Sequence, residues 1–263
     1  MKEVVFFPLY YLGRAIPRLF KSLGEILIFI SQIIRYAVKP PFRFKLILEQ
    51  MEFIGVNSLF IILLAGAFTG MVFVFQVGQA FFKFNAETIT GSVVAIALGR
   101  ELAPVLSALM ITGRAGSAMA AQIGTIRVTQ QIDALVALRV EPINYLVVPR
   151  VIASICMFPI MTAIFDMVGM IGGYFVGVGL LQINKGAFIT NIEWYVHSDD
   201  IMSGIIKAFF FGFISSAICC YKGYFTTQGT RGVGLSTTQA VVISFVSILI
   251  SDYFLTVLLY KPH

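Results

Sequence analysis

Five apolar segments, each long enough to cross a lipid bilayer as a helix, constrain this chain more than any other feature. They cover residues 54–76, 90–112, 151–181, 203–221 and 238–260. A hydrocarbon core of about 30 Å requires about 20 apolar residues in helical form. Only α-helices and closed barrels satisfy all backbone polar groups inside lipid. The pattern therefore predicts an all-α membrane protein with five transmembrane helices.

Composition supports the same class. Of the 263 residues, 58% are hydrophobic and 12% are charged, whereas a soluble domain carries about 25% charged residues. No linker divides the chain, so we expect a single domain over residues 1–263, with an interfacial region over 1–45 and a five-span bundle over 54–260. Cys156, Cys219 and Cys220 lie in apolar spans, which indicates buried thiols and no disulfide framework or metal site.

The N-terminal stretch has an amphipathic pattern. Apolar residues recur every three or four positions from Leu12 to Ala37, and the charged residues fall largely on the opposite side. Pro40 and Pro41 then end the helix. The pattern predicts a helix that lies in the membrane interface. A transmembrane helix is the alternative, but charged and amide side chains interrupt it repeatedly.

The Lys and Arg residues between the spans predict the orientation. One side collects fourteen of them: Lys2, Arg14, Arg18, Lys21, Arg35, Lys39, Arg43, Lys45, Arg114, Arg127, Arg139, Arg150, Lys222 and Arg231. The other side has four: Lys83, Lys185, Lys207 and Lys261. Because cytoplasmic loops carry the excess of positive charge, we expect a cytoplasmic N-terminus and a C-terminus on the outside.

Arg100 and Glu101 lie near the middle of the second apolar segment. A charged side chain there costs roughly 2.5–3.5 kcal/mol on insertion scales, so such residues mark functional sites by default. Neighbouring residues on a helix point about 100° apart, so each needs its own partner. The pair predicts a transport site in which Arg100 binds a phosphate and Glu101 meets an amine or a proton. An ion pair that only stabilises the bundle is the alternative.

Two further carboxylates, Asp166 and Asp252, fall inside the third and fifth segments. They are candidate partners for Arg100, and polar groups that serve packing are the alternative. Small residues also recur at helical spacing in the first and third segments, at Gly66, Gly70, Gly169, Gly172, Gly173 and Gly177. These glycines predict faces where helices approach closely.

The connection between the second and third segments predicts a cytoplasmic coupling helix over residues 125–140, ended by Glu141-Pro142. A short amphipathic helix of this kind suits docking to a partner protein, and a helix lying on the lipid is the alternative. The chain has no P-loop motif and no catalytic constellation of Ser, Cys or His. We therefore expect no enzyme active site, no cofactor, no metal and no nucleic-acid partner.

Several motifs together resemble one family, the MlaE (YrbE-type) permeases. They are Gly-Arg-Glu-Leu-Ala-Pro at 99–104, Gly-Arg-Ala-Gly-Ser-Ala at 113–118, Ile-Gly-Thr-Ile-Arg-Val-Thr-Gln-Gln-Ile-Asp-Ala-Leu at 123–135, and Glu141-Pro142. The resemblance extends from about Gly55 to the end of the chain. It departs from the family at Gln130, where many members have Glu.

The resemblance implies the membrane subunit of an ATP-driven phospholipid transporter in a bacterial inner membrane. Its implied partners are a second copy of the chain, cytoplasmic ABC ATPase subunits that bind ATP and Mg²⁺, a periplasmic ring of MCE-domain protein and a small STAS-domain subunit. The implied role is to maintain the lipid asymmetry of the outer membrane.

The same resemblance assigns Arg100 and Glu101 to a lipid cavity between protomers. It assigns coupling to the ATPase to Arg114, Arg127, Gln131, Asp133, Leu135, Arg139 and Glu141. Two other functions remain open: a proton-coupled secondary transporter that uses Glu101, Asp166 and Asp252, and a membrane scaffold that transports nothing.

Overall fold

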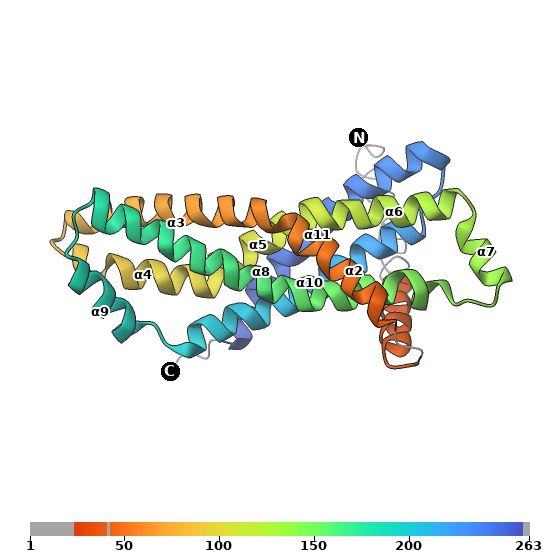
Figure 1. Cartoon of the computed structure of the whole chain (residues 1–263), viewed down its shortest axis with the longest axis horizontal. Helices are drawn as coiled ribbons and strands as arrows, with labels where there is room; N and C mark the ends of the chain where they lie inside the picture. Colours follow the sequence, from red (N-terminus) through yellow and green to blue (C-terminus); the bar gives the residue numbers. More distant parts are fainter. Residues whose placement is uncertain (1–23, 41–42, 260–263) are drawn as a thin grey trace, which may run out of the picture.

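The computed structural model describes residues 24–40 and 43–259, and this part of the chain is helical and contains no strand. Five helical stretches in it are long and apolar enough to cross a membrane: Phe44–Phe82, Glu87–Val128, Ile143–Leu180, Ser198–Tyr224 and Gly229–Leu259. They run along the long axis of an elongated bundle (Figure 1). The predicted all-α membrane fold with five spans is confirmed.

Several stretches are built from more than one helical element. The first contains α2 (Phe44–Ile54), the 3-10 turn η1 (Val56–Ser58) and α3 (Leu59–Phe82). The second contains η2 (Glu87–Ile89), α4 (Thr90–Ala97), η3 (Leu98–Leu102), α5 (Ala103–Ile111), η4 (Thr112–Gly116) and α6 (Ser117–Val128). The third contains η5 (Ile143–Val147), α8 (Val148–Tyr174) and η6 (Phe175–Leu180). The fourth and fifth are single helices, α10 (Ser198–Tyr224) and α11 (Gly229–Leu259), and two short helices lie in connections, α7 (Gln131–Ala137) and α9 (Lys185–Tyr195).

The second stretch is longer than the sequence predicts. We expected it to end near Thr112, but the helix continues to Val128. Its small residues fit against neighbouring helices: Gly116 lies against Cys219 of α10, and Gly124 lies against Thr226 and Val233. The polar, glycine-rich segment is therefore covered by α10 and α11 and does not form a loop.

The predicted single helix over residues 125–140 is wrong in its boundaries. The chain turns at Thr129 and Gln130, and Gln130 has a left-handed backbone with φ of 60°. The short helix α7 follows this turn and projects from the bundle beyond α6 (Figure 1). Ile132 of α7 is buried, whereas Val136 and its neighbour Ala137 are exposed.

The N-terminal amphipathic prediction is testable only from residue 24, because residues 1–23 lie outside the described part. Residues 24–37 are helical. Ile33 is buried and Ile26, Ile30 and Ala37 pack beside it, so the predicted apolar face does contact the bundle. Phe29, which the prediction left out, is buried as well, with its ring 5.6 Å from that of Tyr221.

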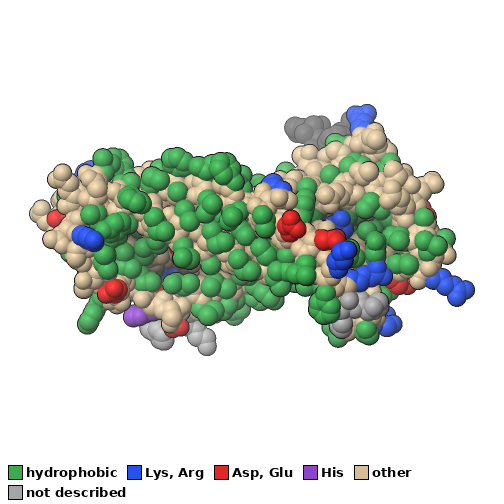
Figure 2. Space-filling model, in the orientation of Figure 1, with side chains coloured by type: hydrophobic (Ala, Val, Ile, Leu, Met, Phe, Trp, Pro, Cys, Tyr) green, Lys and Arg blue, Asp and Glu red, His purple; other side chains and the backbone are tan. Residues whose placement is uncertain are grey.

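Positive charge concentrates where residues 24–37, α7 and the junction of α10 with α11 meet, which we term the basic end. The Lys and Arg side chains form a group at this end, while the middle of the bundle is largely hydrophobic (Figure 2). The described charges there are Arg35, Lys39, Arg43, Lys45, Arg127, Arg139, Lys222 and Arg231. The distribution agrees with the positive-inside pattern of the sequence, and the cytoplasmic location of this end stays a prediction.

Helix α8 lies at the centre of the bundle and packs closely on α3. A side-chain carbon added to Gly70 would overlap the carbonyl group of Gly169, and one added to Gly172 would lie 2.6 Å from the carbonyl oxygen of Ala67. The predicted close approach of these glycine faces is confirmed. Contact between backbones at this distance increases the dispersion attraction that holds helices together in lipid.

The opposite end of the bundle carries α9, and we term it the α9 end. Asn184 caps α9 by accepting a hydrogen bond from the backbone N–H of Ala187, and Phe188 is buried against the bundle. Trp194, the only tryptophan in the chain, points outward and is 76% exposed. Helix α11 is peripheral, because only 11% of its most apolar stretch is buried, against 56% for α10.

Candidate functional site

A π-helical turn places the two central charges of the second span. η3 (Leu98–Leu102) contains Arg100 and Glu101, and Pro104 follows at the beginning of α5. Turns of this kind are frequent at functional sites. Proline has no N–H, so Pro104 cannot donate the helical hydrogen bond to the carbonyl oxygen of Arg100. That oxygen accepts a hydrogen bond of 3.1 Å from Lys207 Nζ of α10 instead.

Lys207 is the centre of a polar group that we term the Lys207 cluster: Lys207, Glu101, Asp252 and Thr256. Its Nζ donates to Glu101 Oε2 at 2.6 Å and to Thr256 Oγ1 at 2.7 Å. With the Arg100 carbonyl, these acceptors use all three ammonium protons. Asp252 Oδ1 lies 3.1 Å from Nζ as a further ion pair.

Burial makes the Lys207 cluster interdependent. The Lys207 side chain is completely buried, while those of Glu101 and Asp252 are 39% and 20% exposed. A buried ammonium is tolerated only when it is paired and fully hydrogen-bonded. The partners of Lys207 come from η3 of the second span and from α11, the fifth span. Lys207 itself lies in the fourth span, so it joins three spans at one point.

Arg100 pairs with a different carboxylate. Its Nε donates to Asp200 Oδ1 at 2.7 Å, and the guanidinium forms an ion pair with the same oxygen. Asp200 lies in the first turn of α10, where its Oδ2 also accepts from the backbone N–H of His197 at 2.9 Å. The first turn of α10 thus holds the Arg100 side chain in place. In the whole site, the two cations Arg100 and Lys207 face three carboxylates, those of Glu101, Asp200 and Asp252.

An apolar groove of about 530 Å³ opens beside these charges. Its walls are Val93, Ile96 and Ala97 of α4, and its polar lining is Arg100, Glu101 and Thr256. A groove with apolar walls and a few placed charges has the chemistry of a site for an amphiphile. Arg100 offers guanidinium donors to an anion, and Glu101 offers a carboxylate to a cation or a proton.

The sequence prediction placed some of these residues wrongly. The charge pattern groups Lys207 with the charges outside the membrane, but Lys207 is the tenth residue of α10 and lies about 15 Å along that helix. Asp252 pairs with Lys207, and Arg100 pairs with Asp200, which lies before the predicted fourth span. Asp166 lies apart from the cluster, near Gly99, and its Oδ1 has no hydrogen-bond partner among the described residues.

The signal for Lys207 was present in the sequence. A lysine followed by Ala-Phe-Phe-Phe-Gly-Phe cannot lie at the edge of a span if the helix begins at Ser198. The acidic pair Asp199 and Asp200 marks that beginning, since carboxylates favour the first turn of a helix. Thr256 gave no signal, because threonine occurs throughout membrane helices.

The residues predicted for coupling are spread over two places. Arg114 donates to the Phe53 carbonyl oxygen at 2.8 Å and to Ser58 Oγ at 3.0 Å. It therefore joins η4 to the bend between α2 and α3 and lies away from α7. Its assignment to ATPase coupling stays a prediction.

The remaining coupling residues lie on and around α7. Arg127 Nη1 and Asp133 Oδ1 form an ion pair of 3.1 Å across the turn between α6 and α7. Gln131, Arg139 and Glu141 are exposed, and Leu135 is partly buried against the bundle. Within residues 24–40 and 43–259, no group of His, Cys, Asp and Glu side chains has the arrangement of a metal site.

Comparison with known proteins identifies the class of this chain, the membrane-spanning permease subunits of ABC transporters. The permease MlaE family model matches residues 47–258. A Rickettsia bellii protein named probable ABC transporter permease protein is 44% identical over 250 residues, covering 95% of this chain and 96% of that protein. The chain belongs to the MlaE permease family, whose subunits are non-catalytic in themselves.

Relatives with more specific names are also similar. The intermembrane phospholipid transport system permease protein MlaE of Haemophilus influenzae is 36% identical over 257 residues, covering 95% of this chain and 96% of that protein. The chloroplastic protein TRIGALACTOSYLDIACYLGLYCEROL 1 of Arabidopsis thaliana is 38% identical over 226 residues, covering 86% and 65%.

Proposed function

We propose that this chain is the membrane subunit of an ATP-driven transporter of phospholipids, and that the groove beside Arg100 and Glu101 holds the lipid headgroup. The groove carries the proposal, since its walls suit acyl chains while the guanidinium and the carboxylate suit a phosphate and an amine. The name of the Haemophilus influenzae relative supports a phospholipid as cargo.

The proposed complex contains two copies of this chain, cytoplasmic ABC ATPase subunits, a periplasmic MCE-domain ring and a small STAS-domain subunit. ATP and Mg²⁺ bind to the ATPase subunits. The exposed apolar surface of α11 supports a second copy as the groove's other wall. The complex resides in the bacterial inner membrane, with the N-terminus in the cytoplasm and the C-terminus in the periplasm, and it maintains outer-membrane lipid asymmetry.

Coupling runs through α7 in this proposal. The exposed side of α7 docks on the ATPase, while the buried Ile132 anchors the helix to the bundle. The Arg127–Asp133 ion pair sets the angle between α7 and α6. Since α6 belongs to the same long helix as η3, a displacement of α7 reaches Arg100 and Glu101. Lipid is released when the closed state binds it more weakly than the open state.

One observation favours the alternative, a proton-coupled transporter. Lys207 faces two carboxylates, Glu101 and Asp252, so the Lys207 cluster can take up a proton without losing its ion pair. Asp166 lies outside this cluster and would not share the proton.

The test is lipid transfer in proteoliposomes that contain the co-purified ATPase. Arg100→Ala and Glu101→Ala should each lower ATP-driven transfer about tenfold or more, as expected when a charge-assisted hydrogen bond is lost, and the complex should assemble normally. Lys185→Ala at the α9 end is the matched control. Normal transfer by both groove variants would overturn the site. Transfer driven by a pH gradient without ATP would support the alternative.

A further inference from the structure

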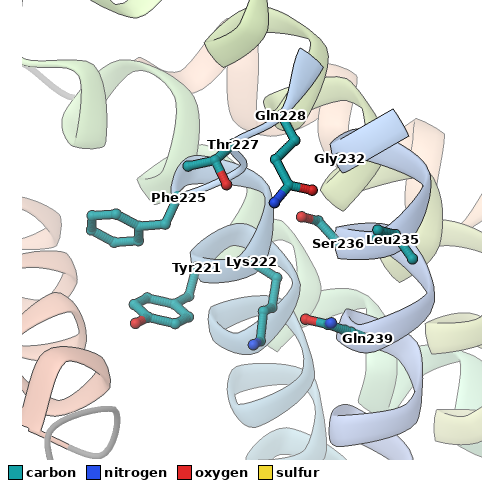
Figure 3. A pocket seen from close by; sticks show the side chains of 9 residues that line it. All are labelled: Tyr221, Lys222, Phe225, Thr227, Gln228, Gly232, Leu235, Ser236 and Gln239. Carbon is teal, nitrogen blue, oxygen red and sulfur yellow. The ribbon is translucent and has the colours of Figure 1, made fainter. Parts of the chain in front are cut away.

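A pocket at the basic end has no part in the transport function proposed above. It lies between the last turns of α10 and the first turns of α11 and has a volume of about 390 Å³. Figure 3 shows Lys222 from α10, Gln228 from the connection, and Ser236 and Gln239 from α11 pointing toward one shared space. Four polar side chains from three consecutive elements therefore converge on this pocket.

These four side chains have no protein partner within the part of the chain that the structure describes. Lys222 is only partly exposed and makes no ion pair there. The neighbouring hydroxyls of Thr237 and Thr238 donate to carbonyl oxygens of their own helix, whereas that of Ser236 does not. The donors in the pocket are thus available to a ligand.

The charge of the pocket selects an anion. Lys222 is the only charged residue in its lining, and no carboxylate lines it. An ammonium, two amides and a hydroxyl together offer several donors to a compact group with several acceptor oxygens. A phosphate ester has this character, and charge-assisted hydrogen bonds to it are the strong kind.

The pocket also lies at the depth of lipid headgroups. Helix α10 has 27 residues and is about 40 Å long, so its ends extend beyond a hydrocarbon core of about 30 Å. Tyr221, which lines the pocket, and Tyr224 are in its last turn, and aromatic residues of this type gather at membrane interfaces. The ring of Phe29 contacts both tyrosines, so the helix of residues 24–37 lies beside the pocket.

We propose that this pocket binds the phosphate group of a phospholipid in the leaflet at the basic end, with Lys222 as its cation and Gln228, Ser236 and Gln239 as hydrogen-bonding groups. Its volume suits a headgroup, and the acyl chains run along the exposed apolar side of α11 that begins at Leu235. Lys222 follows Lys207 by fifteen positions in α10, or about 22 Å along the helix. The pocket is a lipid site separate from the groove, and it does not depend on the groove's being a transport site.

The experiment measures lipid binding to the full-length chain in detergent by native mass spectrometry. Phosphatidylglycerol, diacylglycerol with the same acyl chains, and inorganic phosphate are the three probes. All variants carry Arg100→Ala, which removes the exposed cation of the groove. The compared variants are Lys222→Ala, Lys222→Arg and the control Lys185→Ala.

We expect phosphatidylglycerol to bind more tightly than diacylglycerol. Lys222→Ala should weaken its binding about five- to tenfold, Lys222→Arg should restore it, and Lys185→Ala should leave it unchanged. If Lys222→Ala does not fold, Gln239→Leu should weaken binding about threefold instead. Equal binding by the Lys222→Ala and Lys185→Ala variants, or equal affinity for diacylglycerol, would overturn the proposal. Displacement of the lipid by equimolar inorganic phosphate would identify free phosphate as the ligand and overturn the lipid assignment.

Discussion

Replacing Lys207 by Met removes the cation of the Lys207 cluster and keeps a side chain of similar length. The substitution leaves Glu101 and Asp252 facing each other without the ammonium that lies 2.6 and 3.1 Å from their oxygens. It also removes the two hydrogen bonds that Lys207 donates to Thr256 Oγ1 and to the Arg100 carbonyl oxygen.

The magnitude follows from burial. Removing one partner of a buried ion pair costs about 3–5 kcal/mol. The two carboxylates are 39% and 20% exposed, so solvent reduces this cost, and we expect about 2–3 kcal/mol. If both carboxylates are made neutral as well, in Lys207→Met/Glu101→Gln/Asp252→Asn, most of the loss should be recovered, because no uncompensated charge remains.

The assay is unfolding in mixed micelles with increasing SDS, followed by circular dichroism. Lys185→Met is the control, since an exposed substitution changes stability by less than about 0.5 kcal/mol. A single variant as stable as wild type would refute the reasoning about buried charge. A triple variant no more stable than the single one would show that packing, and not charge, accounts for the loss.

Three further perturbations test other parts of the structure. Gly70→Ala should destabilise the bundle by about 1–3 kcal/mol in the same SDS titration, because the added methyl group meets the Gly169 carbonyl. Gly179→Ala is the control, since its methyl group enters open space and should not change stability. Equal stability of the two variants would contradict the close packing of α3 on α8. Arg127→Asp should uncouple ATP hydrolysis from lipid transfer in the assembled complex and barely change stability. The charge-swapped double variant Arg127→Asp/Asp133→Arg should restore coupling by re-forming the ion pair. A double variant that transports no better than Arg127→Asp would refute a role for the pair. Phe29→Ala should release residues 24–37 from α10, seen as faster hydrogen exchange in that helix alone, and unchanged exchange there would mean that other contacts suffice.

The five spans were predictable because a bilayer imposes a length and an apolar composition that are read directly from the sequence. Arg100 and Glu101 were predictable for the same reason, since charge inside a span is rare. Their partners were not. Asp200 and Lys207 are about a hundred residues away in sequence, and only the packing of α10 against η3 brings them together.

The end of the second span was mispredicted for a related reason. A hydropathy pattern treats each helix as if lipid surrounded it, and the segment from Gly113 to Gly124 is poor in apolar bulk. In the fold, α10 and α11 cover this segment, and its small residues allow that contact. Glycine content was therefore a sign of burial by other helices and not of a loop.

The position of Trp194 has a spectroscopic consequence. Because it is the only tryptophan of the chain and projects from the end of α9, intrinsic emission excited at the red edge of the absorption band reports a single location. A shift of that emission on changing the lipid around Trp194 needs no label and no deconvolution. Events at the basic end, at the opposite end of the bundle from α9 (Figure 1), would leave this signal constant, so the emission reports on the α9 end alone.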